Sequence, residues 1–194
     1  MFKKLYNWML SKAESPAAVP SLAAISFIES SVFPLPPDIM LIPMCLANRK
    51  KAFWYAFVCS VASIIGGMLG YSIGYFLYET VGKWILNLYG GADDSYATFK
   101  KAFDDMGFWL VLMAGFTPFP FKVITICSGL AKLNIGVFLI AAAVSRSARF
   151  FFEAALIYVY GEKIRNLLEK HLELITALFF LLLVGGFLLI KFVL

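Results

Sequence analysis

The chain has 194 residues, of which 61% are hydrophobic and 17% aromatic, while only 15% are charged. A soluble domain of this length could not bury so much apolar surface, so the composition argues against a soluble protein and predicts a lipid environment. The net charge of +5 is modest and lacks the clustered basic face that nucleic-acid binding needs, so no nucleic-acid partner is expected.

Residues 1–19 are predicted to form an amphipathic helix that lies at the membrane surface. Apolar residues recur there at helical spacing, from Phe2 to Ala13, and charged residues interrupt the apolar run that a secretory signal would need. We therefore expect this segment to be retained.

Residues 20–48 are apolar but contain the stretch "FPLPPDIMLIP", with three of its prolines at Pro34, Pro36 and Pro37. Proline breaks helices, and a segment of this length is too short for two membrane crossings. We predict a re-entrant hairpin that enters and leaves on one face of the membrane, with Asp38 at its tip and Glu29 in its first arm.

Residues 52–80 contain a long charge-free run and are predicted to be a transmembrane helix, because about 20 apolar residues suffice to cross a bilayer. Small residues recur every fourth position at Gly66, Gly70 and Gly74. Such spacing lines them up on one helix face and allows another backbone to approach closely.

Residues 93–106 are predicted to form a second interfacial helix, since apolar residues alternate with aspartates at helical spacing. Residues 108–132 repeat the earlier pattern, with an apolar segment broken by Pro118, Pro120 and Lys122. We predict a second re-entrant hairpin with its tip at these prolines.

Residues 135–160 are long enough to cross the membrane and carry Arg146, Arg149 and Glu153 on one helical face. Residues 161–194 then comprise a polar loop and a C-terminal transmembrane helix that looks like an anchor.

The two hairpins align when the chain is shifted by 84 residues, so that Pro34 meets Pro118, Pro36 meets Pro120 and Asp38 meets Lys122. The distribution of basic residues places the N-terminus in the cytoplasm and the hairpins on opposite faces. The predicted fold is therefore an all-α polytopic membrane protein, built as an inverted repeat in which each re-entrant hairpin precedes a transmembrane helix.

Six ionisable residues fall within the predicted membrane segments: Glu29, Asp38, Lys122, Arg146, Arg149 and Glu153. A charge in hydrocarbon is costly, so we expect these side chains to gather around a polar cavity. Lys122 and the two arginines would bind a phosphate headgroup, and the carboxylates would pair with them or carry protons. The alternative is that Arg149 and Glu153 merely pair internally while Arg146 reaches the lipid headgroups.

No enzymatic site is expected. His171 is the single histidine, which makes a serine–histidine dyad or a histidine metal cluster hard to build, and no metal or other cofactor is predicted.

The segments "FIESSVFPLPPDIMLIP", "GGMLGYSIGYF" and "GFTPFPFKVITICSGLAKLNIGVF" resemble the DedA family, whose core is also called the VTT or SNARE-associated domain. The resemblance covers about residues 20–160. Within the family, the chain resembles a shorter, divergent branch. This resemblance implies a bacterial inner-membrane protein with opposed re-entrant hairpins, and a link to polyprenyl-phosphate recycling, phospholipid scrambling and the proton motive force. The positions that match are Glu29 and Asp38 in the first half, with Lys122, Arg146 and Arg149 in the second.

The expected function is therefore that of a lipid-phosphate flippase or scramblase, with membrane lipids and protons as its partners. Two alternatives stay open: a proton- or cation-coupled transporter of small solutes that supports pH homeostasis, and a non-transporting protein that organises the membrane. The sequence does not decide the oligomeric state, and a homo-oligomer is one of the alternatives.

Overall fold

A computed structural model describes residues 15, 17–31, 36–77, 92–117, 120–161 and 163, with side chains in the helix that begins at residue 92 described from residue 99 onward. These residues form helices and contain no strand. The elements are α2 (Ala18–Ser31), α3 (Asp38–Ala47), the short 3-10 helix η1 (Arg49–Lys51), α4 (Ala52–Leu77), α6 (Ala92–Phe116), α7 (Phe121–Leu130) and a long last helix, Ile135–Gly161.

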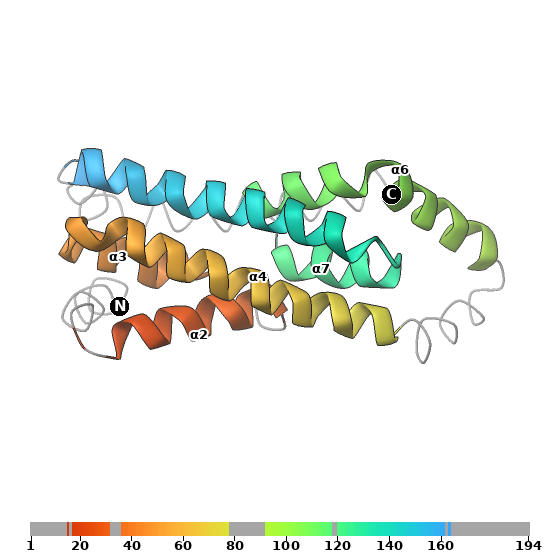
Figure 1. Cartoon of the computed structure of the whole chain (residues 1–194), viewed down its shortest axis with the longest axis horizontal. Helices are drawn as coiled ribbons and strands as arrows, with labels where there is room; N and C mark the ends of the chain where they lie inside the picture. Colours follow the sequence, from red (N-terminus) through yellow and green to blue (C-terminus); the bar gives the residue numbers. More distant parts are fainter. Residues whose placement is uncertain are drawn as a thin grey trace, which may run out of the picture.

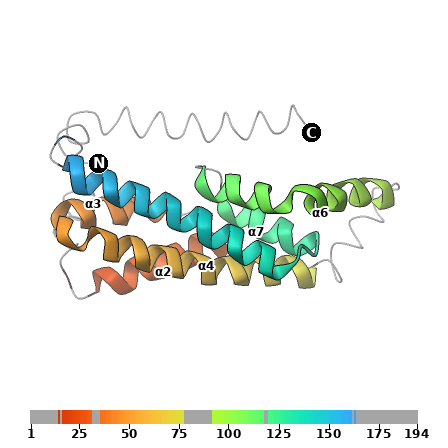
Figure 2. The same cartoon turned by 45° about the horizontal axis from the view of Figure 1, so that its top comes forward.

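Two long helices, α4 and Ile135–Gly161, form the axis of the molecule, and two pairs of shorter helices pack along them (Figure 1). The pair α2–α3 lies along one half of α4, and the pair α6–α7 lies toward the other half, an arrangement that persists when the view is turned (Figure 2). One apolar core joins Leu22, Leu41 and Phe150, and a second joins Phe121 and Phe138. The molecule thus has two halves, each with a core of its own.

Proline explains where the paired helices stop and start. Helix α6 ends at Phe116 because Thr117 precedes a proline, and such a residue is disfavoured in the α conformation. Pro120 then holds an extended backbone before α7. Pro37 likewise stands directly before α3, whose first turn carries Asp38, where a negative charge is favoured by the helix dipole.

The last helix begins with a side-chain cap. The Asn134 side-chain oxygen accepts hydrogen bonds from the backbone N–H groups of Gly136 (2.9 Å) and Val137 (3.2 Å). These bonds satisfy backbone N–H groups that the first turn of a helix cannot pair internally. The cap therefore fixes where the last helix begins.

The three regularly spaced glycines of α4 lie where other backbones approach it. A Cβ atom on Gly66 would overlap the carbonyl of Phe27 in α2, and one on Gly74 would overlap the carbonyl of Ile126 in α7. A Cβ on Gly70 would collide with the Thr125 hydroxyl. One face of α4 therefore contacts both α2 and α7, which brings the two halves of the molecule together.

The exterior is strongly apolar. Large exposed side chains on three helices include Trp54, Phe76, Met113, Ile140 and Val159. Two helices, Arg49–Leu77 and Ile135–Gly161, are long and apolar enough to cross a membrane. An apolar surface of this extent is expected to face lipid or another protein.

The structure differs from the sequence-based prediction in residues 93–132. A separate interfacial helix at 93–106 and a first hairpin arm from 108 are not distinct elements, because α6 runs continuously from Ala92 to Phe116. Gly107 does not interrupt the helix, since its missing side chain makes room for Leu133, which packs against it.

Several predicted features lie outside the described residues. These are most of the N-terminal helix 1–19, the prolines Pro34 and Pro118, and nearly all of residues 161–194 with the C-terminal transmembrane helix.

Candidate functional site

Arg146 lies near the middle of the last helix and is completely buried. Its Nη2 donates a hydrogen bond to Glu29 Oε2 (2.8 Å), and its Nε donates to the Ser63 hydroxyl (2.6 Å). Its guanidinium carbon lies 4.8 Å from the ring centre of Phe121 and 4.7 Å from that of Phe150. A buried arginine is tolerated only with such partners, so Arg146 is a fixed, paired cation.

Two serines close this contact into a ring of hydrogen bonds. The Ser30 hydroxyl donates to Glu29 Oε2 (3.0 Å) and lies 2.7 Å from the Ser63 hydroxyl. Because each hydroxyl has one hydrogen, Ser63 donates to Ser30 and accepts from Arg146. Glu29 therefore receives two donors on one oxygen.

Arg149 follows one turn later and connects the two helix breaks. Its Nη2 donates to Asp38 Oδ2, at the start of α3, and its Nη1 lies 3.4 Å from the carbonyl oxygen of Thr117, directly after α6. The Thr125 hydroxyl of α7 also contacts the carbonyl oxygen of Ser30 near the end of α2 (3.3 Å). Arg149 therefore joins segments 111 and 32 positions away from it, and the contact between Thr125 and Ser30 spans 95 positions.

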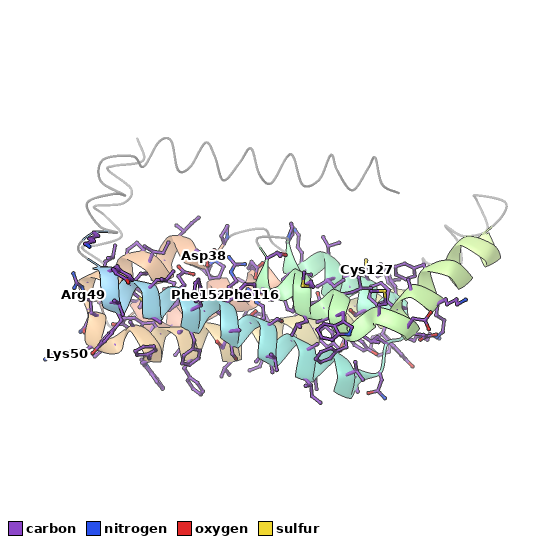
Figure 3. All side chains as sticks on the ribbon, turned by 90° about the horizontal axis from the view of Figure 1, so that it is seen from above. Asp38, Arg49, Lys50, Phe116, Cys127 and Phe152 are labelled. Carbon is purple, nitrogen blue, oxygen red and sulfur yellow. The ribbon has the colours of Figure 1, made fainter. Side chains whose placement is uncertain are left out.

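Glu153 lies one further turn along the same helix. Its carboxyl lies beside the carboxyl of Asp38 and within electrostatic range of both arginines. Asp38 Oδ1, Glu153 Oε1 and Arg146 Nη1 are buried, and none has a hydrogen-bond donor or acceptor among the described residues. Figure 3 shows Asp38 away from the end of the molecule that carries Arg49 and Lys50.

The structure brings together five of the six charged residues singled out in the sequence: Glu29, Asp38, Arg146, Arg149 and Glu153. The pairing differs from both sequence-based interpretations. Asp38 binds Arg149, although the repeat aligned it with Lys122, and Arg149 binds Asp38 where an internal pair with Glu153 was the alternative. Lys122 lies half-buried on the first turn of α7.

Sequence reasoning missed the uncharged members of the site. Ser30 and Ser63 complete the hydrogen-bond ring, while Phe121 and Phe150 enclose Arg146. The available signal for Ser63 was its position three residues before Gly66, next to the small-residue face of α4. Among the described residues, no group of three His, Cys, Asp or Glu side chains could hold a metal ion.

Comparison with known protein families identifies the family of this chain. A family model described as the VTT domain matches residues 35–159, well over half of the sequence. The chain belongs to the VTT-domain family, which is the DedA family. The resemblance inferred from the sequence motifs is therefore confirmed.

Two curated relatives are similar to this chain over most of their length. An uncharacterized protein of Haemophilus influenzae is 38% identical over 177 residues, which is 90% of each chain. An uncharacterized protein of Histophilus somni is 35% identical over 175 residues, covering 90% of this chain and 91% of the relative. No solved structure matches.

The family assignment settles the environment of the site. VTT-domain proteins are membrane proteins, so the apolar exterior and the two long helices belong to a protein that resides in a lipid bilayer. The matched region contains Asp38, Lys122, both arginines and Glu153, whereas Glu29 precedes it by six residues.

Proposed function

We propose that this VTT-domain protein is a flippase or scramblase for lipids that carry a phosphate headgroup, such as a polyprenyl phosphate or a phospholipid. The observation that carries the proposal is the placement of Arg146 and Arg149. Two planar guanidinium groups lie on one helix face, between the breaks of two helix pairs, inside a protein whose exterior is apolar. Arginine suits phosphate because its planar fork can bind two oxygens at once.

In this proposal α2–α3 and α6–α7 are re-entrant hairpins that enter the bilayer of the bacterial inner membrane from opposite faces. Helices α2, α3 and α7 have 14, 10 and 10 residues, too few to cross a core that requires about 20. Exposed backbone groups at a helix break are tolerated in a membrane only inside protein or water. The contacts of Arg149 with Thr117 and of Thr125 with Ser30 support such internal breaks.

The headgroup phosphate would bind by competing with Asp38 for Arg149. Arg149 and Asp38 each retain 19% of their side-chain surface, while Arg146 retains none, so Arg149 is the more accessible cation. Arg146 contributes positive charge and its Nη1, which has no acceptor among the described residues. Lys122, on the first turn of α7, would add a third cation, and carboxylates of the site would carry protons that couple movement to the proton motive force.

A second candidate is a membrane-organising protein that transports nothing. It is favoured by the fact that both arginines already have internal carboxylate partners. In that case Asp38→Asn would destabilise the protein in detergent to the same extent as it weakens the cellular phenotype. A transport role predicts a lost phenotype with a much smaller loss of stability.

A translocation assay across several lipids tests the proposal. The purified chain is reconstituted into vesicles that contain fluorescent lipids with a phosphate headgroup or an uncharged headgroup, with and without a pH gradient. We expect transfer of the phosphate-bearing lipids to be accelerated and the uncharged lipid to stay at the protein-free rate. Equal rates for both lipids, or dissipation of the pH gradient without any lipid transfer, would contradict it and favour a scramblase without selectivity or a small-solute transporter, respectively.

A further inference from the structure

Glu153 is a half-buried residue whose Oε1 atom is buried, and neither ion pair uses its carboxyl. It lies four residues after Arg149 and therefore points from the same face of the last helix. The carboxyl in contact with it, that of Asp38, comes from α3 at the other side of the site. Each of these two carboxyls has one buried oxygen that lacks a donor among the described residues.

Two ionised carboxylates cannot form a hydrogen bond, because both groups only accept. Contact between them is stable when one proton lies between the pair, so that one carboxyl donates to the other. A shared proton would also satisfy a buried oxygen that otherwise has no partner.

We propose that Asp38 and Glu153 share one proton and form the proton-binding site of this protein. The site itself does not depend on the proposed lipid activity, and only its role in transport rests on that function. The proton is bound by the carboxyl pair as a unit and is not assigned to either residue alone.

The charges around the pair fit this assignment. With one proton the carboxyl pair carries a single negative charge, which Arg149 balances, and Arg146 is balanced separately by Glu29. The other titratable groups that face Glu153 are Cys45 of α3 and Cys59 of α4, whose neutral thiols add no charge. A cation in place of the proton is less suitable, since no third carboxylate, cysteine or histidine joins the pair among the described residues.

Glu29 is not a proton carrier in this account. Its Oε2 accepts hydrogen bonds from both Arg146 and Ser30, so its carboxyl is already occupied as the partner of a buried arginine. The proton-carrying role that the sequence left open among Glu29, Asp38 and Glu153 is therefore assigned to Asp38 with Glu153.

The pair is connected to phosphate binding through Asp38. Asp38 uses one oxygen for Arg149, and its other oxygen is the buried one without a donor. A second proton on the pair would remove the carboxylate that neutralises Arg149, and Arg149 would then be available to an anion. Proton uptake and headgroup binding would thus favour the same state of the site.

Infrared spectroscopy of the full chain in lipid nanodiscs tests the shared proton. We expect the wild type at neutral pH to show the C=O stretch of a protonated carboxyl that disappears at alkaline pH. The band should be lost in Glu153→Gln and shifted or lost in Asp38→Asn, because each substitution removes one member of the pair. Asp104→Asn, at an exposed position of α6, serves as the control and should leave the band unchanged.

The wild-type spectrum decides the matter even if a variant fails to fold. Absence of the band at neutral pH would overturn the proposal, as would an unchanged band in both Glu153→Gln and Asp38→Asn. Lipid translocation measured on the same samples separates the two claims. A band without translocation would leave the proton site standing and refute the lipid activity, whereas translocation without the band would refute only the proton site.

Discussion

Arg146 is the residue on which the centre of the molecule depends most. It binds Glu29 and Ser63 through two different nitrogens while its guanidinium lies against the rings of Phe121 and Phe150. Lysine carries its donors on a single nitrogen and has no planar group to lie against the two rings. A residue that keeps only the positive charge would therefore not replace the planar guanidinium of Arg146.

We expect Arg146→Lys to destabilise the protein by about 1.5–3 kcal/mol, the usual cost of losing a hydrogen bond to a charged group. Unfolding in detergent, followed by heat or denaturant, measures the change. Lys100→Ala is the control, because Lys100 forms an exposed pair with Asp104 on α6 and should cost less than about 0.5 kcal/mol. Equal stability of the two variants would show that Arg146 has no special structural role.

The sequence predicted which charged residues form the site, but it did not predict their partners. An ionisable residue in an apolar segment stands out in composition because it is costly there. Its partner is set by tertiary packing, and here Arg146 and Glu29 are 117 positions apart. The shift that aligned Asp38 with Lys122 reflects similar segments, not contact, which explains why Asp38 is found with Arg149 instead.

The elements pack through the small-residue face of α4, and Gly74 tests this arrangement. An added Cβ would overlap the carbonyl of Ile126, a backbone atom that cannot move without displacing α7. We expect Gly74→Ala to destabilise the protein by about 1–3 kcal/mol, as overpacking commonly does. The same detergent unfolding measurement applies.

Gly67→Ala provides a matched control in the same helix. The nearest atom to its added Cβ would be a ring carbon of Phe121 at 3.3 Å, which can shift slightly. Alanine is also favoured over glycine in a helix by about 0.5–1 kcal/mol, so the net change should be near zero. A Gly67→Ala variant that is as unstable as Gly74→Ala would argue against the specific contact between α4 and α7.

At this scale the sequence predicted an all-helical chain and the packing face of α4, but not the length of α6. Four-residue spacing of small residues is a local pattern, and it correctly indicated close backbone approach on one face of α4. The continuous helix α6 was not predicted because its side chains change from polar to apolar along its length, while its backbone stays helical throughout. Gly107 lies between the segments predicted at 93–106 and 108–132, but its place in the helix depends on Leu133, which is distant in sequence.

The whole molecule has two ends that should face opposite sides of the membrane. Arg49 lies beside Gly161 at one end, and Phe103 packs with Leu133 near the other. Single cysteines at the exposed positions Lys50 and Lys101 report on these ends. We replace Cys127, which is half-buried, with serine to lower the background, since Cys45 and Cys59 are buried.

A thiol reagent that cannot cross the membrane should label Lys50→Cys and Lys101→Cys from opposite sides in sealed vesicles. The expectation follows from α4 crossing the bilayer between the two positions, with the α2–α3 and α6–α7 pairs entering from opposite faces. Labelling of both cysteines from the same side would end the inverted-hairpin arrangement, whatever the protein transports.

The central claim is that the arginine face moves a phosphate headgroup, and lipid translocation by Arg149→Gln tests it most directly. The variant is compared with wild type and Lys100→Gln at equal amounts of folded, reconstituted protein, using a phosphate-bearing lipid. We predict a rate at least about tenfold lower for Arg149→Gln, equivalent to about 1.4 kcal/mol, and an unchanged rate for Lys100→Gln. A folded Arg149→Gln protein that translocates the lipid at the wild-type rate would contradict the claim.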